Sequence, residues 1–72
     1  MKERIVKVIQ QTFEINEVSD DISMINCEKW DSLNHLNLMV ALETEFDIII
    51  EPEMMVEMRS LDEVIASIAT LV

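Results

Sequence analysis

The residues best placed for chemistry lie in the segment "KWDSLNHL", residues 29–36, where a helical pattern begins. Asp31 is a good N-cap, because its carboxylate can accept backbone N–H bonds at the open end of the helix. Ser32 then takes the first or second helical position, where free N–H groups and the helix dipole favour a negative group by about 0.3–1 kcal/mol. A phosphodiester on the Ser32 hydroxyl would suit this place, and an ordinary serine at a helix start fits the same residues.

A catalytic site belonging to the chain itself is not expected. His35 lies three residues after Ser32 on a neighbouring part of the helix, but a third orienting residue is missing, and the chain has no glycine for an oxyanion hole. We therefore expect His35 to be an exposed helix histidine. Cys27 has only Lys29 as a nearby base to activate its thiol, so we expect a half-buried loop cysteine.

A metal site is not predicted either. Asp20 and Asp21 stand side by side, but the segment lacks the glycine and the ligand spacing of a calcium loop. Clustered surface acids of this kind bind divalent ions only loosely. The sequence thus offers a modifiable serine without catalytic or metal-binding machinery.

The elements that position Ser32 follow from hydrophobic spacing. Apolar residues three and four apart predict a first amphipathic helix over residues 2–13. Residues 14–31 lose this periodicity and read as a long connection, with one turn of helix expected near residues 20–24. A connection this long in a small domain is often functional.

The second predicted helix, residues 32–46, carries two apolar stripes, so it should be covered on more than one side. The stripes are Leu33, Leu36 and Val40, and Leu38, Ala41, Leu42 and Phe46. After an extended "IIIEP" segment, Pro52 starts a brief helix through residue 58. Ser60 and Glu63 form a capping box that opens a last helix. Its inward residues are Leu61, Val64, Ile65, Ile68 and Leu71.

These elements predict an all-α fold, a small bundle of three longer helices plus one short helix. We expect residues 1–72 to form a single domain, because a chain of this length supports one core. One cysteine excludes an internal disulfide framework and fits a reducing compartment. No signal peptide and no apolar run long enough to span a bilayer is found. We therefore expect a cytoplasmic monomer.

The net charge of −10 limits the partners. Such an acidic surface repels nucleic acid phosphates and anionic lipid, and it attracts basic protein surfaces. DNA binding is therefore not expected. The acids are equally consistent with a simpler role, which is to keep a small hydrophobic domain soluble.

The motif D-S-L at residues 31–33, followed at the right spacing by "ALETEF", resembles the acyl carrier protein family. The order of helices extends this resemblance over essentially all 72 residues. It implies that Ser32, within Asp31-Ser32-Leu33, carries a 4'-phosphopantetheine arm added from coenzyme A by a basic phosphopantetheinyl transferase. The arm's thiol would hold acyl groups as thioesters for acyl-activating and acyl-transferring enzymes, in fatty acid, polyketide or related biosynthesis. Such a carrier is not itself an enzyme.

The resemblance also implies two surfaces on this chain. An acyl pocket between the second, third and fourth helices would be lined by Leu42, Phe46, Ile50, Met55, Met58 and Val64. A docking surface for partner enzymes would comprise Leu33, Leu36, Asn37, Val40, Glu43 and Glu45.

The sequence departs from the family pattern at several positions. Residues where relatives often have acids are Asn34, His35, Asn37, Thr44 and Val56, which suggests different partners from those of housekeeping fatty acid synthesis. Residues Cys27 to Trp30 stand where many relatives have a glycine shortly before the D-S-L motif. This loop must therefore turn without a glycine to adopt positive φ. We expect Trp30 to pack on the helix ends or beside the arm.

Two alternatives stay open from the sequence. An aminoacyl or peptidyl carrier also places its serine at a helix start, although its usual motif has glycine where Asp31 stands. An unmodified acidic adaptor within a protein complex would share the fold but have no need for the Ser32 hydroxyl.

Overall fold

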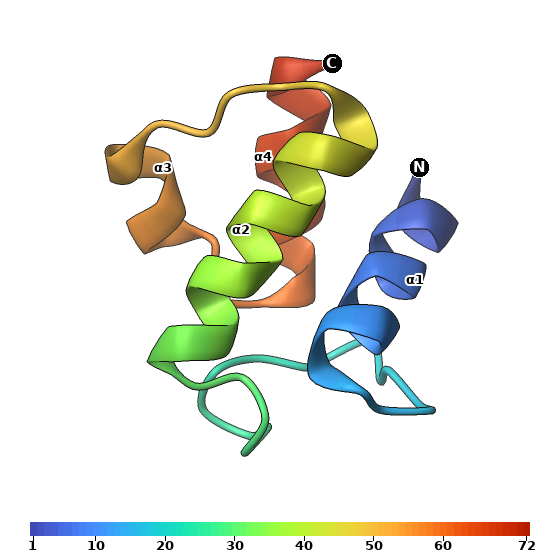
Figure 1. Ribbon diagram of the computed structural model, residues 1–72. Coiled ribbons are helices and arrows are strands. Elements are labelled where there is room, and N and C mark those ends of the chain that lie inside the picture. The colour runs from blue at the N-terminus through green and yellow to red at the C-terminus, as the bar shows by residue number, and fades with distance from the viewer.

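The computed structural model describes residues 1–72 and contains four helices and no strand. The helices are α1 (Lys2–Phe13), α2 (Ser32–Phe46), α3 (Pro52–Glu57) and α4 (Leu61–Leu71). In Figure 1, α1 and α2 run in opposite directions, α4 lies behind α2, and the short α3 stands at the other side of α2 from α1. The predicted all-α fold with three longer helices and one short helix is confirmed.

Two helices end in a left-handed residue although the chain has no glycine. Glu14 after α1 has φ 56°, and Asp47 after α2 has φ 54°. The backbone N–H groups of these two caps bond to the carbonyls of Gln10 and Glu43, so they satisfy groups that a helix end leaves free. A residue with a Cβ adopts this conformation at a cost of roughly 1–2 kcal/mol.

Ser60 caps α4 as predicted, but Glu63 accepts from the Ser60 hydroxyl and not from the Ser60 backbone N–H, as it would in a full capping box. The backbone N–H of Glu63 donates to Ser60 Oγ at 3.2 Å, and Ser60 Oγ donates to Glu63 Oε1 at 3.1 Å. This exchange closes the start of α4 from within the local sequence. It explains why the start of α4 could be predicted from the sequence.

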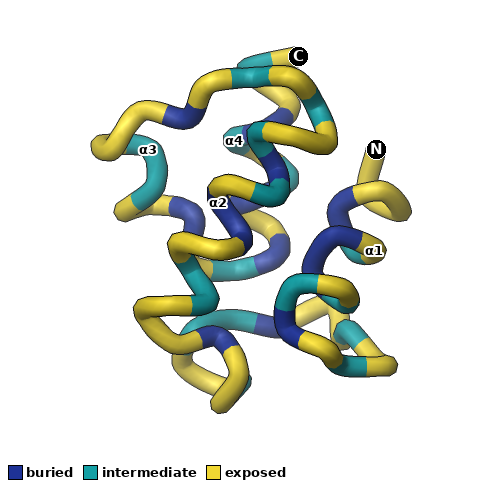
Figure 2. The backbone as a smooth tube through the Cα atoms, in the orientation of Figure 1, coloured by how far each residue is buried: buried dark blue, intermediate teal, exposed yellow.

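All buried residues are apolar, and they form one cluster to which every longer helix contributes. Figure 2 shows buried stretches on α1, α2 and α4 and also in the segments that connect the helices. The members are Ile5, Val8, Ile9, Phe13, Ile22, Trp30, Leu38, Met39, Leu42, Ile50, Met58, Leu61, Val64 and Ile68. Of the stripes expected on α2, the one with Leu38 and Leu42 faces this core, together with Met39, whose burial the stripes did not predict.

The other α2 stripe faces away from the core. Leu33, Leu36 and Val40 are 68%, 56% and 61% exposed, respectively. On α4, Leu61, Val64 and Ile68 are buried as expected, whereas Ile65 and Leu71 are half-buried. The helix bounds therefore came from local spacing, while the packing of four elements decided which apolar face is covered.

The connection of residues 14–31 packs against the bundle without forming a helix. Residues 20–24 contain a hydrogen-bonded turn, in which the N–H of Ile22 donates to the carbonyl of Ser19 at 3.2 Å, but the expected turn of helix is not formed because neighbouring backbone groups bond to the segment before α4. The carbonyl of Ile22 accepts from the N–H of Leu61 at 3.0 Å, and Met24 N–H donates to the carbonyl of Arg59 at 3.0 Å. The side chain of Asn26 also bonds to backbone groups of the same loop, in competition with helical bonds.

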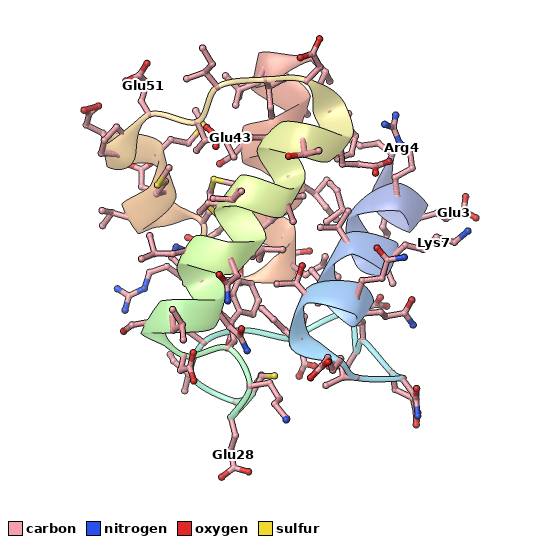
Figure 3. The ribbon with its side chains drawn as sticks, viewed as in Figure 1. Glu3, Arg4, Lys7, Glu28, Glu43 and Glu51 are labelled. Atoms are coloured by element: carbon pink, nitrogen blue, oxygen red, sulfur yellow. The ribbon has the colours of Figure 1, made fainter.

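Two ion pairs connect α1 to later parts of the chain. Lys2 Nζ lies 3.0 Å from Asp20 Oδ1 in the connection, and Arg4 Nε lies 3.0 Å from Glu45 Oε2 on α2. The guanidinium of Arg4 also stands 4.3 Å from the centre of the Phe46 ring. Glu3 and Lys7, by contrast, extend from α1 on the side away from α2 (Figure 3). No helix has the length and apolarity needed to cross a membrane.

Candidate functional site

The start of α2 presents Ser32 to solvent in a fixed backbone frame. Asp31 is extended, with φ −92° and ψ −176°, and its Oδ1 accepts the N–H of Asn34 at 2.8 Å, as predicted for an N-cap. The Asn34 side chain donates to the carbonyl of Lys29 at 2.7 Å, which ties the approach to the first turn of the helix. Ser32 itself is exposed, and its hydroxyl makes no hydrogen bond within the chain.

Two backbone donors at this end of α2 have no acceptor in the protein. The carbonyl and carboxylate of Asp31 take the N–H groups of His35 and Asn34, respectively. The N–H groups of Ser32 and Leu33 are left without a partner. They belong to a 15-residue helix, so its dipole adds to their attraction for a negative group. The geometry suits an anionic group on the Ser32 oxygen.

The five serines of the chain differ in how free their oxygens are. Ser60 Oγ is engaged in the cap of α4, and Ser23 Oγ accepts the N–H of Ile25 at 3.2 Å. Ser67 is half-buried in the middle of α4. Ser19 is exposed but lies within the long connection. Ser32 combines an exposed hydroxyl with a helix N-terminus, which no other serine does.

Trp30 anchors the segment that leads to Ser32. Its ring is 1% exposed and packs against Phe13 at the end of α1, with the ring centres 5.4 Å apart. It also stacks beside His35, with ring centres 6.2 Å apart. Trp30 thus packs on the ends of α1 and α2, which is the first of the two positions expected for it, the other being beside the arm. The loop turns without glycine and without positive φ, since the left-handed residues lie at helix ends.

His35 is not the exposed helix residue expected from the sequence. It is half-buried, and both ring nitrogens are engaged: Trp30 Nε1 donates to Nδ1 at 3.0 Å, and Nε2 lies 2.8 Å from the carbonyl oxygen of Met55 in α3. Neither nitrogen is free to act as a base toward Ser32, so the pair is not a catalytic dyad. The sequence signal for its burial is the spacing of three and seven residues to Leu38 and Leu42 on the buried stripe of α2.

Cys27 and Asp20 are the other residues considered as candidates for a functional site. Cys27 is half-buried in the loop, as expected. Asp20 is paired with Lys2, and no group of three acidic, cysteine or histidine residues is arranged to hold a metal ion.

The six residues proposed for an acyl pocket lie in or against the core. Leu42, Ile50, Met58 and Val64 are buried, and Phe46 and Met55 are half-buried. The hollows of the surface are elsewhere: one lies beside residues 15–29 of the connection, and the other is between residues 23–25 and 59–63. The structure therefore places these apolar side chains within the packed core or against it, and Phe46 stands beside Arg4 of α1.

The residues proposed for docking separate into two groups. Leu33, Leu36, Asn37 and Val40 are all exposed on one face of α2. The two acids have structural partners instead. Glu43 accepts the N–H of Ile50 at 2.9 Å, and Glu45 is paired with Arg4. The outward face of α2 is therefore apolar and neutral along most of its length.

Comparison with known proteins agrees with this geometry. A family model described as "Phosphopantetheine attachment site" matches residues 3–68, so the chain belongs to the phosphopantetheine-binding carrier family. A solved structure described as "a putative acyl carrier protein(Rv0033) from Mycobacterium tuberculosis" is similar, with a TM-score of 0.85 and 26% sequence identity over 96% of this chain and 95% of that one. No curated protein matches the sequence.

Membership establishes a covalent 4'-phosphopantetheine cofactor and a carrier without a catalytic site of its own. It also implies modification by a phosphopantetheinyl transferase and the use of partner enzymes. The residues present fit the group, because the start of α2 offers an exposed hydroxyl beside two unpaired N–H donors. When bound, the group supplies a terminal thiol that can form a thioester.

Proposed function

We propose that Ser32 is the attachment residue and that the protein delivers acyl groups, held as thioesters on the arm, to partner enzymes of fatty acid, polyketide or related biosynthesis. One observation carries this proposal: the free, exposed Ser32 oxygen at the N-terminus of α2, with the N–H groups of Ser32 and Leu33 unpaired beside it. Asp31 caps the helix without using these donors.

The surface next to Ser32 supports recognition by partner enzymes. Leu33, Leu36 and Val40 form an exposed apolar stripe that begins one residue after the attachment point. Exposed apolar residues grouped on one helix face are typical of interaction sites. The net charge of −10 attracts basic partners over longer distances and increases the rate of encounter.

The interior below α3 supports sheltering of an acyl chain. The six proposed pocket residues are apolar, and every buried residue of the protein is apolar as well. An acyl chain that entered this interior would therefore not deprive a buried polar side chain of its hydrogen bond. One of the six, Met55, belongs to α3, which has six residues and no fully buried side chain. A short helix with little burial can move at low cost, which would open the space beneath it.

The attachment is tested by mass spectrometry after incubation with coenzyme A and a phosphopantetheinyl transferase. The wild type and Ser19→Ala should each gain the mass of one phosphopantetheine group, and Ser32→Ala should gain none. Ser19→Ala is the matched control, because Ser19 is the other exposed serine with no hydrogen bond to its hydroxyl. An equal gain on Ser32→Ala, or no gain on the wild type, would refute the assignment.

The transferred cargo is tested on the modified protein. Acyl-activating enzymes should load it with fatty acyl groups, observed as the corresponding further gain in mass. Loading with amino acids instead would identify an aminoacyl or peptidyl carrier. An adaptor that is never modified would keep its bound proteins in the Ser32→Ala variant.

A further inference from the structure

The two hydrogen bonds of His35 join three separate parts of the chain. Trp30 lies in the segment before Ser32, His35 lies in the second turn of α2, and Met55 lies in α3. An indole N–H can only donate, so Nδ1 of His35 must accept from Trp30 Nε1. In a neutral imidazole the proton is then on Nε2, which donates to the carbonyl of Met55. One tautomer satisfies both bonds.

The bond to Met55 meets a need at the end of α3. Met55 is in the last turn of this helix, where carbonyls lack intrahelical partners. Its carbonyl accepts a weak bond from the N–H of Met58 at 3.3 Å, and Nε2 of His35 supplies the shorter one at 2.8 Å. No other hydrogen bond joins residues 52–57 to another helix.

Side-chain packing holds α3 only partly. Met54 and Met55 are half-buried, the other residues of the helix are exposed, and none is fully buried. Figure 2 shows buried residues on either side of α3 but none within it, and Figure 1 shows the long arch that leads into it from α2. A side chain that ties this helix to α2 therefore has a large influence on its position.

We propose that His35 is a positioning residue that holds α3 closed against the apolar core, on which Met54 and Met55 pack, and links this closure to Trp30, two residues before Ser32. The inference rests on the proposed function in one respect, since the space that would open when α3 moves is the one assigned to the acyl chain. Entry of an acyl chain then requires release of the bond between Nε2 and Met55. His35 takes no part in bond making or breaking.

The first test uses the protein without its prosthetic group, and amide hydrogen exchange of α3 is measured. His35→Asn keeps an acceptor near the position of Nδ1 but cannot reach Met55, whereas His35→Gln places an amide donor near the position of Nε2. Loss of one net hydrogen bond should speed exchange in residues 52–58 by roughly threefold to tenfold in His35→Asn. Exchange in His35→Gln should stay within about twofold of the wild type on the same scale.

Exchange in α1 serves as the internal control, because a general loss of stability would speed it as well. Equal exchange of α3 in the wild type and His35→Asn would overturn the proposal, as would equal acceleration in both variants. If His35→Asn fails to fold, the tautomer of the wild type decides. The chain has one histidine, so its ring ¹⁵N shifts are unambiguous. A proton on Nδ1 instead of Nε2 would contradict the inference.

The second test concerns cargo and uses the modified protein loaded with octanoyl or acetyl groups. Release of α3 in His35→Asn should slow cleavage of the octanoyl thioester by hydroxylamine, because the longer chain enters the space more often. The acetyl thioester is too short to be sheltered and should react at the wild-type rate. Equal octanoyl rates would refute the link to cargo. Absence of any modification at Ser32 would refute the proposed function alone, since the exchange test does not depend on it.

Discussion

Replacement of Trp30 by phenylalanine should destabilise the protein by an amount that the structure allows us to estimate. The change removes the indole N–H that donates to His35 Nδ1 at 3.0 Å, and a net hydrogen bond contributes about 0.5–1.5 kcal/mol. It also leaves a space in a site that is 1% exposed, which adds a cavity term. Together we expect a loss of about 2 kcal/mol in the free energy of unfolding.

Truncation to alanine should cost about 3–5 kcal/mol, as for other buried aromatic residues. Small domains are stable by only about 5–15 kcal/mol, so Trp30→Ala should be close to unfolding. Urea unfolding followed by circular dichroism measures both variants without depending on the fluorescence of the residue removed. Val56→Ala is the control, because Val56 is 67% exposed and should change stability by less than about 0.5 kcal/mol.

The result that would refute this reasoning is a Trp30→Phe variant within about 0.5 kcal/mol of the wild type, the range of a neutral surface substitution. It would mean that neither the bond to His35 nor the ring volume removed from this buried site contributes measurably to stability. The same variant should be modified at Ser32 more slowly, because the segment that presents the serine loses its anchor. A modification rate equal to that of the wild type would show that Trp30 stabilises the fold but is not needed to present Ser32 to the transferase.

Two further predictions concern a helix end and the outward face of α2. Glu14→Gly should stabilise the protein by about 1 kcal/mol, since φ 56° is unfavourable for a residue with a Cβ, and a lower urea midpoint than that of the wild type would contradict this. Leu36→Asp should weaken binding of the phosphopantetheinyl transferase about tenfold if the apolar stripe is the docking surface, as expected for a central interface residue. Ile49→Asp, which adds the same charge at another exposed apolar position, should bind within about twofold of the wild type in the same titration.

The packing of His35 shows what sequence reasoning could not predict. Position 35 stands three residues before Leu38 and seven before Leu42, so helical spacing places it on the stripe that faces the core, but spacing does not say which groups its ring nitrogens contact. Its partners lie in the preceding loop and in α3, 5 and 20 residues away in the chain. Only the path of the α2–α3 connection brings the Met55 carbonyl within reach of the ring.

The roles of the two acids of α2 also could not be predicted from the sequence. Glu43 and Glu45 belong to a pattern that the family resemblance assigns to partner docking. In the structure one accepts a backbone N–H from Ile50 and the other pairs with Arg4, 41 residues away. The Arg4 partner is far from α2 in sequence, and the Ile50 partner depends on how the chain turns after α2, so charge pattern alone could not separate these two acids from free surface acids.

The sequence by itself determined the four helices, the Asp31 and Ser60 caps, and the candidate serine. These features follow from residues within one or two helical turns, because hydrogen bonds and side-chain contacts inside a helix join near neighbours. The tertiary structure decided which stripe of α2 is buried and which residues hold α3. Those outcomes depend on the simultaneous packing of all four elements, and no local pattern carries that information.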